Sequence, residues 1–459
     1  MKLTYNVQDK PKMGQVIVFA LQQLLAILAA TIAVPAIVGN GMSQSAALFG
    51  AGVGTLVYLA FTKFKSPVFL GSSFAFLGSM AAAFAGGVSM NLGYLGLLLG
   101  ALFAGLVYVV IAIIVKFCGV QWINKLMPAV VIGPTVAIIG LSLSGNAVGD
   151  LATGNVMHKV LDEAGNVVLN EAGEAVMAQN ASVYLCILCG LITLAVTMLC
   201  SVYGKKMLKM IPFIIGICAG YATAAILTVI GNAASIPAMQ IIDFGKFANM
   251  QWLPSFTFMT AFGGFSELTG AYVAKIFVAY VPVAFVVFAE HIADHKNLSS
   301  IIEHDLLEDP GLHRTLLGDG IGSMAGAFFG GCPNTTYGES VGCVAISGNA
   351  SVITILVTAF LAIVAAFVAP FTTFLSTIPS CVMGGVCIAL YGFIAVSGLK
   401  MIQSVDLGDN RNLFVVSVIL IAGVGGLTVS FGKVTLTEVA CALILGILTN
   451  LILAKKKED

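Results

Sequence analysis

Apolar runs recur along the whole chain, and short polar segments separate them. A run of about 20 apolar residues is the length that crosses a bilayer as an α-helix. Because such runs follow one another from end to end, we predict an all-α polytopic membrane protein with fourteen transmembrane segments. The predicted segments are residues 14–36, 43–62, 67–85, 92–115, 127–146, 182–203, 210–231, 272–294, 315–330, 335–348, 351–372, 381–399, 412–430 and 434–454.

Composition and charge support this pattern and give it an orientation. Of the 459 residues, 59% are hydrophobic and 9% are charged, whereas charged residues make up roughly 25% of an ordinary soluble domain. Short cytoplasmic loops collect Lys and Arg. With fourteen segments, all Lys and Arg fall on the side of the N-terminus except Lys159, Lys246, Lys275 and Lys433. We therefore predict a multi-pass protein of the cell inner (cytoplasmic) membrane with both termini cytoplasmic.

Two predicted outer loops are long. Residues 147–181 contain the near-repeat "LDEAGNVV" and "LNEAGEAV", whose alternating apolar residues predict a small exposed β-hairpin that is peripheral to any site. Residues 232–264 carry Trp252 and several Phe residues, which favour the membrane interface.

Two apolar runs contain residues that disfavour a helix. The stretch "CPNTTYGESVG" (332–342) lies in the tenth segment, and "PVFLGSSFAF" (67–76) lies in the third. Non-helical backbone at membrane depth must be enclosed by protein or line a cavity. We expect a short extended piece in each segment, and a helix that begins near Glu339 in the tenth.

The two interruptions occupy matching positions, third in each set of seven segments. Paired interruptions in two halves mark a transporter's substrate site, and an odd number of segments per half makes the repeats inverted. We expect the extended pieces to meet near the midplane and to present backbone N–H groups and helix N-termini to a ligand. The alternative is that both breaks are packing irregularities.

The eighth segment ends in a cluster of ionisable residues, "FAEHIADH". A charge at the bilayer centre costs at least ~3 kcal/mol, so such residues usually face a cavity or a partner and serve a function. Glu290 follows an unbroken apolar run, and we assign it to the site. We expect His295 in solvent at the cytoplasmic rim, and for Asp294 the rim and a functional role stay open. His291 and His295 have an i, i+4 spacing that can bind zinc, but Ile292 stands where metalloproteases have Glu, so no metal is expected.

Several stretches resemble a known family. "GSSFAF", "FAEHI", "DLLEDPGLHR" and "PNTTYGE" are similar to the nucleobase–cation symporter-2 family, also called nucleobase–ascorbate transporters, and within it to the bacterial uracil permeases. The resemblance extends from "LQQLLAILAATIAVP" to "LYGFIAVSGLK". "PNTTYGE" is the most specific stretch, because xanthine and urate members usually carry a Gln-Asn pair there.

The resemblance implies a 7+7 inverted repeat in which spans 3 and 10 are broken by short extended strands. Spans 1–4 and 8–11 would form a core domain, and spans 5–7 and 12–14 a gate domain. The boundaries would be 1–13 for the N-terminus, 14–126 and 272–372 for the core, 127–231 and 381–454 for the gate, and 455–459 for the C-terminus.

The resemblance also implies a substrate site. Glu290 and Glu339 match two carboxylates that hydrogen-bond a pyrimidine ring, and the backbone amides of Phe74 and Gly338 match the contacts to its carbonyl groups. The full implied set is Glu290, Glu339, Phe74, Gly338, Tyr337 beside the site, Ala30 in the first segment and the gate-facing Tyr391.

Two positions depart from the family pattern. Asp294 stands where the family often has a His implicated in proton handling, and Ser340 stands where many members have Asn. The first departure puts the proton pathway in doubt, and the second puts the local bracing of the site in doubt.

These features predict proton-coupled uptake of uracil by alternating access of core against gate, and no enzyme activity. Carboxylates accept the N–H groups of uracil, and backbone N–H groups donate to its carbonyl oxygens. A buried carboxylate favours its protonated form, so Glu290, Asp294 and Glu339 are the candidates for proton coupling. A xanthine or uric acid permease of the same family and an anion transporter on the same fold are the alternatives.

The expected partners are uracil, H⁺ and membrane lipid. We expect no cofactor and no nucleic acid, and no Na⁺ site is evident. The oligomeric state stays open, with a homodimer through the gate domain as one alternative.

Overall fold

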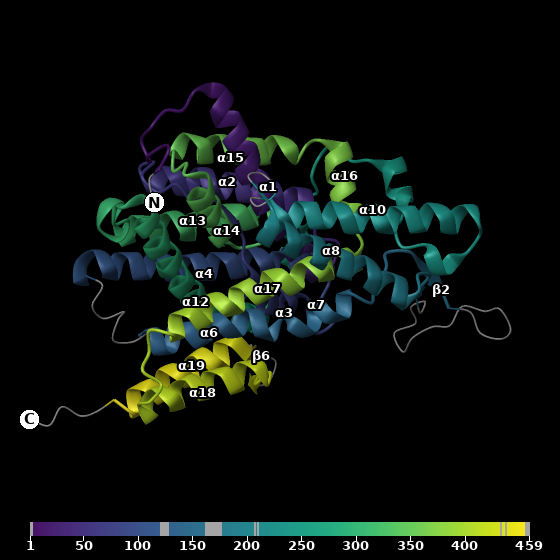
Figure 1. Cartoon of the computed structure of the whole chain (residues 1–459). Coiled ribbons are helices and arrows are strands. Elements are labelled where there is room, and N and C mark those ends of the chain that lie inside the picture. The colour runs from purple at the N-terminus through teal and green to yellow at the C-terminus, as the bar shows by residue number, and fades with distance from the viewer. Residues whose placement is uncertain are drawn as a thin grey trace, which may run out of the picture. The chain divides into compact units, whose positions relative to one another are not determined.

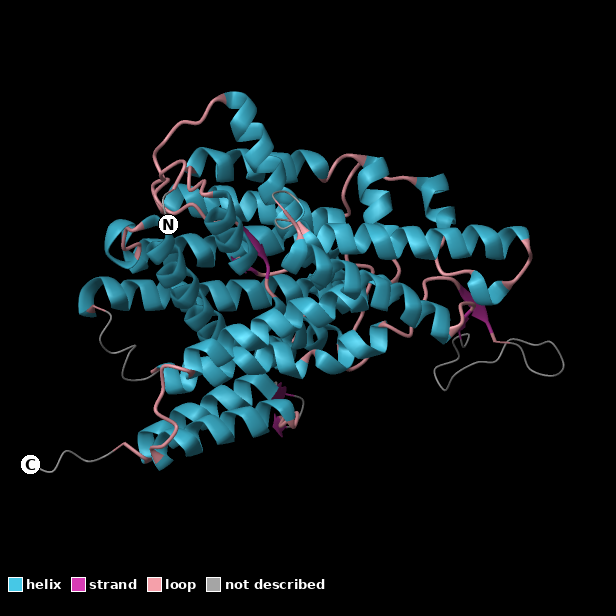
Figure 2. Cartoon of the chain, viewed as in Figure 1, coloured by secondary structure: helices cyan, strands magenta, loops and turns pink. Residues whose placement is uncertain are grey.

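The structure, a computed structural model, describes residues 3–119, 128–160, 177–205, 208, 211–431, 434–436 and 438–454. Helices dominate these residues, and the strands are only three residues long (Figures 1 and 2). The longer helices are α1 (Met13–Val38), α2 (Gln44–Phe61), α4 (Met90–Cys118), α6 (Ala129–Ser142), α8 (Val183–Tyr203), α10 (Pro212–Ala233), α12 (Gly270–Ile302), α13 (Leu312–Gly330), α15 (Val352–Ala365), α17 (Ser380–Ile402), α18 (Asn410–Val424) and α19 (Glu438–Ile452).

Shorter elements interrupt or connect these helices. The short helices are α3 (Leu77–Phe84), α7 (Ser144–Asp150), α11 (Thr257–Ala261), α14 (Gly338–Ser347) and α16 (Ala369–Thr377), with the 3₁₀ turn η1 (Phe74–Phe76). The strands are β1 (Leu70–Ser72), β2 (Met157–Lys159), β3 (Met177–Gln179), β4 (Asn334–Thr336), β5 (Val429–Phe431) and β6 (Val434–Leu436).

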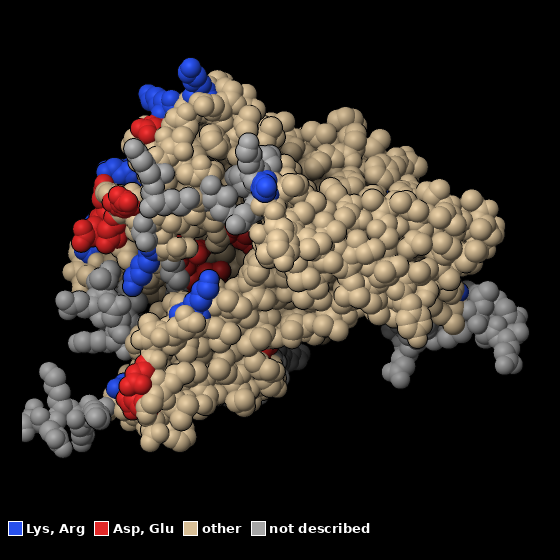
Figure 3. Space-filling model, viewed as in Figure 1, with Lys and Arg blue, Asp and Glu red and all other residues tan. Residues whose placement is uncertain are grey.

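The long apolar helices make this a multi-pass membrane protein. Among the described residues, 8 helices are long and apolar enough to cross a bilayer, or up to 9 if α15 and α16, which are bent by 83°, form one span. Wide stretches of the face in Figure 3 carry no charged side chain, as contact with lipid tails requires. Each predicted segment overlaps at least one described helix. The predicted run over 351–372 is nevertheless not one helix, because α15 ends before the bend.

The chain divides into two compact units. One comprises Met1–Ser142, Leu253–Val368 and Tyr391–Asp459, and the other comprises Leu143–Trp252 and Ala369–Leu390. The division into a core and a gate domain concerns movement during transport, and it stays a prediction.

Helix contacts within the first unit are reciprocal. α2 packs against α13 and α15, while α13 also packs against α4. α1 contacts α14 and α15, and α12 contacts α3 and α4. If α1–α4 are matched with α12–α15 in order, each of these contacts has a counterpart in the other set.

Glycines let α2 and α13 close around the strand β4. A Cβ atom on Gly54 would lie 2.4 Å from Nδ2 of Asn334, and one on Gly326 would lie 2.1 Å from the same atom. That Nδ2 donates to the carbonyl oxygen of Gly50 at 3.2 Å. The Asn334 side chain therefore fills the gap that the missing side chains leave and fixes β4 against both helices.

The second unit contains the predicted outer hairpin. β2 and β3 pair antiparallel, with Met157 opposite Gln179, and β2 is exposed. The loop thus contains an antiparallel strand pair on either side of the near-repeat from which the hairpin was predicted. The near-repeat at 161–176 lies outside the described residues.

Candidate functional site

The two broken segments meet through a short antiparallel ladder. β1 pairs with β4 in the register Leu70–Thr336, Gly71–Thr335 and Ser72–Asn334. The backbone N–H of Ser73 donates to the Pro333 carbonyl at 2.9 Å, which extends the ladder by one bond. The helical turns η1 and α14 begin just after these strands. The predicted extended pieces, their meeting and the helix start near Glu339 are confirmed.

A side chain of α2 and the side chain of Tyr337, which follows β4, hold the first strand in position. The N–H of Leu70 donates to Oγ1 of Thr55 at 2.9 Å. The hydroxyl of Tyr337 donates to the Ser72 carbonyl at 2.9 Å. A Cβ atom on Gly71 would lie 2.3 Å from the Tyr337 ring, so only glycine lets this ring lie across the strand.

Ser340 braces the site by joining its own helix to two other segments of the chain. Its Oγ accepts the backbone N–H of Phe69, just before β1, at 3.0 Å. The amide of Gln23 in α1 donates to the Ser340 carbonyl at 3.3 Å and also to its Oγ. Ser340 is fully buried, and Gln23 is 3% exposed. Ser340 therefore still braces the site, although many family members have Asn at this position. Its hydroxyl joins α14 to α1 and to the third segment.

Three carboxylates gather where α12 passes the second break. Glu339 lies in the first turn of α14, and the charges of Asp294 and Glu339 act on Glu290. Thr336 donates its hydroxyl to Oδ2 of Asp294 at 2.8 Å. A Cβ atom on Gly338 would lie 3.9 Å from Oδ1 of Asp294. Asp294 therefore contacts the broken segment itself and is only partly exposed.

Aromatic side chains lie at the first break. Phe74 and Tyr391 pack edge to face, with ring centroids 5.6 Å apart and an interplanar angle of 81°. Phe74 is 8% exposed and Tyr391 is 3% exposed. Ala30, 1% exposed, lies about two helical turns along α1 from Gln23. These residues offer apolar surface, whereas the carboxylates come from α12 and α14.

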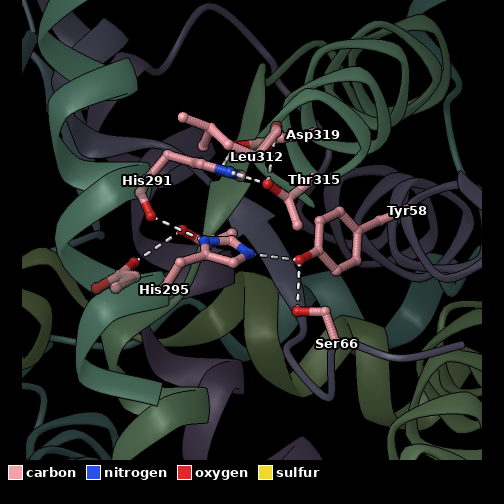
Figure 4. A network of polar contacts seen from close by, with 9 residues as sticks. Tyr58, Ser66, His291, His295, Leu312, Thr315 and Asp319 are labelled. Atoms are coloured by element: carbon pink, nitrogen blue, oxygen red, sulfur yellow. Dashed lines mark hydrogen bonds and ion pairs between the residues drawn. The ribbon is translucent and has the colours of Figure 1, made fainter. Parts of the chain in front are cut away.

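The expectation for His295 is wrong, because its ring is 1% exposed. α12 continues to Ile302, so His295 lies about two turns inside the helix. Its Nδ1 contacts the His291 carbonyl at 2.8 Å, and its Nε2 contacts the Tyr58 hydroxyl at 2.7 Å (Figure 4). The face of this helix end that carries His291 and His295 is therefore buried against protein and not solvated.

A buried polar network next to the carboxylates was not predicted from the sequence. His291 contacts Oδ2 of Asp319 through Nδ1 at 2.7 Å and Thr315 Oγ1 through Nε2 at 3.0 Å (Figure 4). The hydroxyl of Tyr58 donates to Ser66 at 2.7 Å. Asp319 was detectable, since it is an ionisable residue in the predicted segment 315–330. Tyr58, Thr315 and Ser66 had no such signal. The ring nitrogens of both histidines are all engaged, which leaves none directed at a metal.

Two broken segments that meet through their strands, with carboxylates at the break, are typical of the substrate site of a polytopic membrane transporter. The Xan_ur_permease family, described as "Permease family", matches residues 14–431. The chain therefore belongs to this family of nucleobase–cation symporters and is a transporter, not an enzyme.

Similar proteins match over nearly their whole length. The uracil permease of Bacillus caldolyticus is 38% identical, with 98% of this chain and 95% of that protein covered. The uracil permease of Escherichia coli K12 is 35% identical, with 97% and 93% covered. A putative pyrimidine permease, RutG, of the same organism is 30% identical, with 97% and 91% covered.

Solved structures share the fold at low sequence identity. The transmembrane domain of the cyanobacterial bicarbonate transporter BicA superposes with a TM-score of 0.63 at 14% identity, covering 98% of this chain and 99% of that one. The murine Solute Carrier 26 family member A9 anion transporter, in its inward-facing state, gives a TM-score of 0.63 at 12% identity, covering 97% and 69%. At this identity the likeness concerns the fold alone.

Proposed function

We propose that this protein is a uracil:H⁺ symporter of the cytoplasmic membrane. The observation that carries the proposal is the meeting of β1 and β4 beside Glu290, Asp294 and Glu339. Relatives named as uracil permeases, 35–38% identical over almost the full chain, support the choice of substrate.

The chemistry of uracil matches these groups. Its two N–H donors need acceptors, which Glu290 and Glu339 supply as carboxylates, and its two carbonyl oxygens need donors. Backbone N–H groups at Phe74 and Gly338 stand at the starts of the helical turns, where orphan N–H groups are directed outward. Tyr337 supports this arrangement through its bond to Ser72, while Phe74, Tyr391 and Ala30 supply apolar surface for the flat ring.

Proton coupling follows from crowding these acids together. Like charges at close range cannot all ionise cheaply, so Glu290, Asp294 and Glu339 share protons and titrate together. An ionised Glu290 accepts an N–H of uracil, while a proton held elsewhere in the cluster offsets its charge. Loss of substrate and proton to the cytoplasm then completes the cycle.

We further propose that transport occurs by alternating access in a fourteen-span, 7+7 inverted repeat. The reciprocal contacts that match α1–α4 with α12–α15 support two related halves. The antiparallel pairing of β1 with β4 is what inversion of one half requires. In this scheme core residues 14–126 and 272–372 move against gate residues 127–231 and 381–454, and both termini stay cytoplasmic.

Uptake into proteoliposomes under an inward proton gradient tests the substrate. We expect labelled uracil to accumulate, with unlabelled uracil competing far better than xanthine or sulfate. Stronger competition by xanthine would assign a purine substrate instead. Sulfate transport would favour an anion carrier, although facing carboxylates repel anions.

Glu290→Ala tests the site. Because the variant removes a charged acceptor, we expect calorimetry to detect no uracil binding while the purified protein stays folded. The matched control is Glu308→Ala, which removes an exposed glutamate outside the site and should bind as wild type does. Near wild-type affinity in Glu290→Ala would overturn the assignment.

A further inference from the structure

We infer that the buried His291–Asp319 pair is a second proton-binding site, which sets the charge that the substrate carboxylates experience. The inference rests on the proposed function, since it concerns how uracil and proton binding are linked. The pair lies outside the set Glu290, Asp294 and Glu339, and both of its side chains are fully buried.

The contacts of His291 allow two arrangements of its protons. In the first, Thr315 donates its single hydroxyl proton to the Leu312 carbonyl at 3.0 Å. Its Oγ1 can therefore only accept from His291, so Nε2 of His291 carries a hydrogen. Nδ1 then faces Oδ2 of Asp319 at 2.7 Å. Two bare acceptors would repel at this distance, so one proton lies between Nδ1 and Oδ2.

The arrangement in which His291 and Asp319 hold this shared proton is the loaded state of the pair. Whether the shared proton sits on His291 or on Asp319, the two side chains together carry no net charge. Oδ1 of Asp319 has no hydrogen-bond partner among the described residues. An unpaired oxygen is less costly in a neutral acid than in a carboxylate, so the uncharged form of both partners fits the site better.

Thr315 lets the pair release that proton without losing its contacts. In the unloaded state, neutral His291 donates Nδ1–H to ionised Asp319, and Nε2 becomes an acceptor. The Thr315 hydroxyl then rotates from the Leu312 carbonyl and donates to Nε2. One hydroxyl rotation thus accommodates both protonation states, which differ by one proton and by one negative charge.

The surrounding titratable groups restrict where the charge can go. The His295 ring stacks on His291 with centroids 4.0 Å apart, and two stacked cations repel, so the two rings do not charge together. Tyr58 from α2 bonds His295, and the ring of Tyr108 from α4 packs edge to face on His291. The remaining acids that face this region are Glu290 and Asp294 from α12 and Glu339 from α14.

The pair is electrostatically linked to the substrate site. The charge of Asp319 acts on both Glu290 and Asp294. Loading the pair removes that charge, which makes an ionised Glu290 less costly and so favours acceptance of a uracil N–H. Coupling of this kind is reciprocal, so uracil binding must in turn promote proton uptake by the pair.

Two variants imitate the loaded state by different chemistry. Asp319→Asn replaces the protonated acid by a neutral amide of the same shape, whose N–H can still donate to Nδ1. His291→Phe keeps a ring on His295 but removes the donor that would hold an ionised Asp319, so the acid stays neutral. Both variants should therefore bind uracil without the proton that the pair takes up, so fewer protons are taken up per uracil than in wild type. A pair with a merely structural role predicts no such common behaviour.

Calorimetry of the full-length protein in detergent tests the inference. Uracil is titrated in buffers of different ionisation enthalpy over a pH series, which gives protons taken up per uracil. In wild type the affinity should fall by up to about tenfold per pH unit once the pair unloads. In both variants it should depend less steeply on pH and stay close to the wild-type value at acid pH. Proton-driven accumulation in proteoliposomes should be weaker than in wild type, while uracil exchange persists.

The control is Asp305→Asn, an exposed aspartate whose Oδ1 accepts the Leu307 N–H at 2.8 Å, and it should titrate as wild type does. Wild-type proton uptake in Asp319→Asn would overturn the inference and leave coupling to Glu290, Asp294 and Glu339. Loss of binding by both variants at acid pH would also overturn it, since both keep the pair neutral. If wild type itself binds no uracil, the proposed substrate fails instead.

Discussion

The two broken segments have the same architecture but different chemistry. Each consists of a three-residue strand followed by a helical turn, β1 with η1 and α3, and β4 with α14. The first turn of α14 contains the acid Glu339, whereas neither η1 nor α3 has an acid in its first turn. An acid at a helix N-terminus partly neutralises its positive end. In the proposed site, the first break therefore offers backbone N–H donors, whereas the second adds a carboxylate acceptor to its own N–H donor.

This difference shows how a symmetric fold serves an asymmetric ligand. The N–H donors and carbonyl acceptors of uracil alternate around one part of a ring that has no two-fold symmetry, so two identical half-sites would leave some of its groups unpaired. The supporting contacts are asymmetric as well, because Ser340 and Tyr337 in the second segment both bond to backbone around the first. The second half thus supplies both the charge and the bracing.

Glu339→Gln should have the largest effect among tests of this comparison. The amide keeps the shape but replaces the charged acceptor, and hydrogen bonds to charged groups are the stronger kind. We expect uracil affinity to fall by about 10- to 100-fold in calorimetry. Glu308→Gln, in an exposed position, is the matched control. An unchanged affinity would mean that the two breaks contribute alike.

Gly71→Ala should destabilise the first break without touching an ionisable group. The added methyl would lie 2.3 Å from the buried Tyr337 ring, so the ring or the strand must move, at a cost of about 1–3 kcal/mol. A lowered melting temperature in detergent should report this. The matched control is Gly342→Ala in α14, where nothing lies within 4 Å. It should be neutral or stabilising by up to about 1 kcal/mol, and equal losses in both would contradict the packing argument.

Removing the ion pair between Lys65 and Asp309 should have the smallest effect of the three tests. Lys65, just before the first broken segment, donates to Asp309 at 2.7 Å and holds the pKa of that carboxyl below its usual range. A lowered pKa contributes stability above the unfolded pKa, and this contribution is lost as pH falls through the folded pKa. The side chains are 41% and 49% exposed, so solvent screens the pair.

Melting temperatures from neutral to acid pH measure this contribution. Wild type should lose slightly more stability on acidification than Asp309→Asn, and added salt should reduce the difference. If the melting temperatures of wild type and Asp309→Asn change in parallel with pH at low salt, the ion pair does not contribute to stability.

The sequence by itself determined the helices and the two breaks. Lipid surrounds much of this chain, so a spanning helix must be apolar along its length. Residues that disfavour a helix, such as Pro67 and Pro333, are therefore recognisable from the local sequence. The resemblance supplied the site residues, of which Phe74 and Tyr391 are in contact and Gly338 lies beside Asp294. Their roles in binding stay predictions.

Only the tertiary structure decided which polar residues are enclosed. His295 is the last residue of the ionisable cluster that ends the eighth segment, and from sequence this position favoured solvent, but α2 supplies Tyr58 as its partner. Asp319 and His291 lie 28 residues apart and meet only because the fold brings a side chain of α13 within hydrogen-bond distance of one on α12. Ser340 braces Phe69 across 271 residues. Hydropathy is calculated from residues that are neighbours along the chain. The partner that stabilises a buried polar group comes from another helix, so hydropathy does not include it.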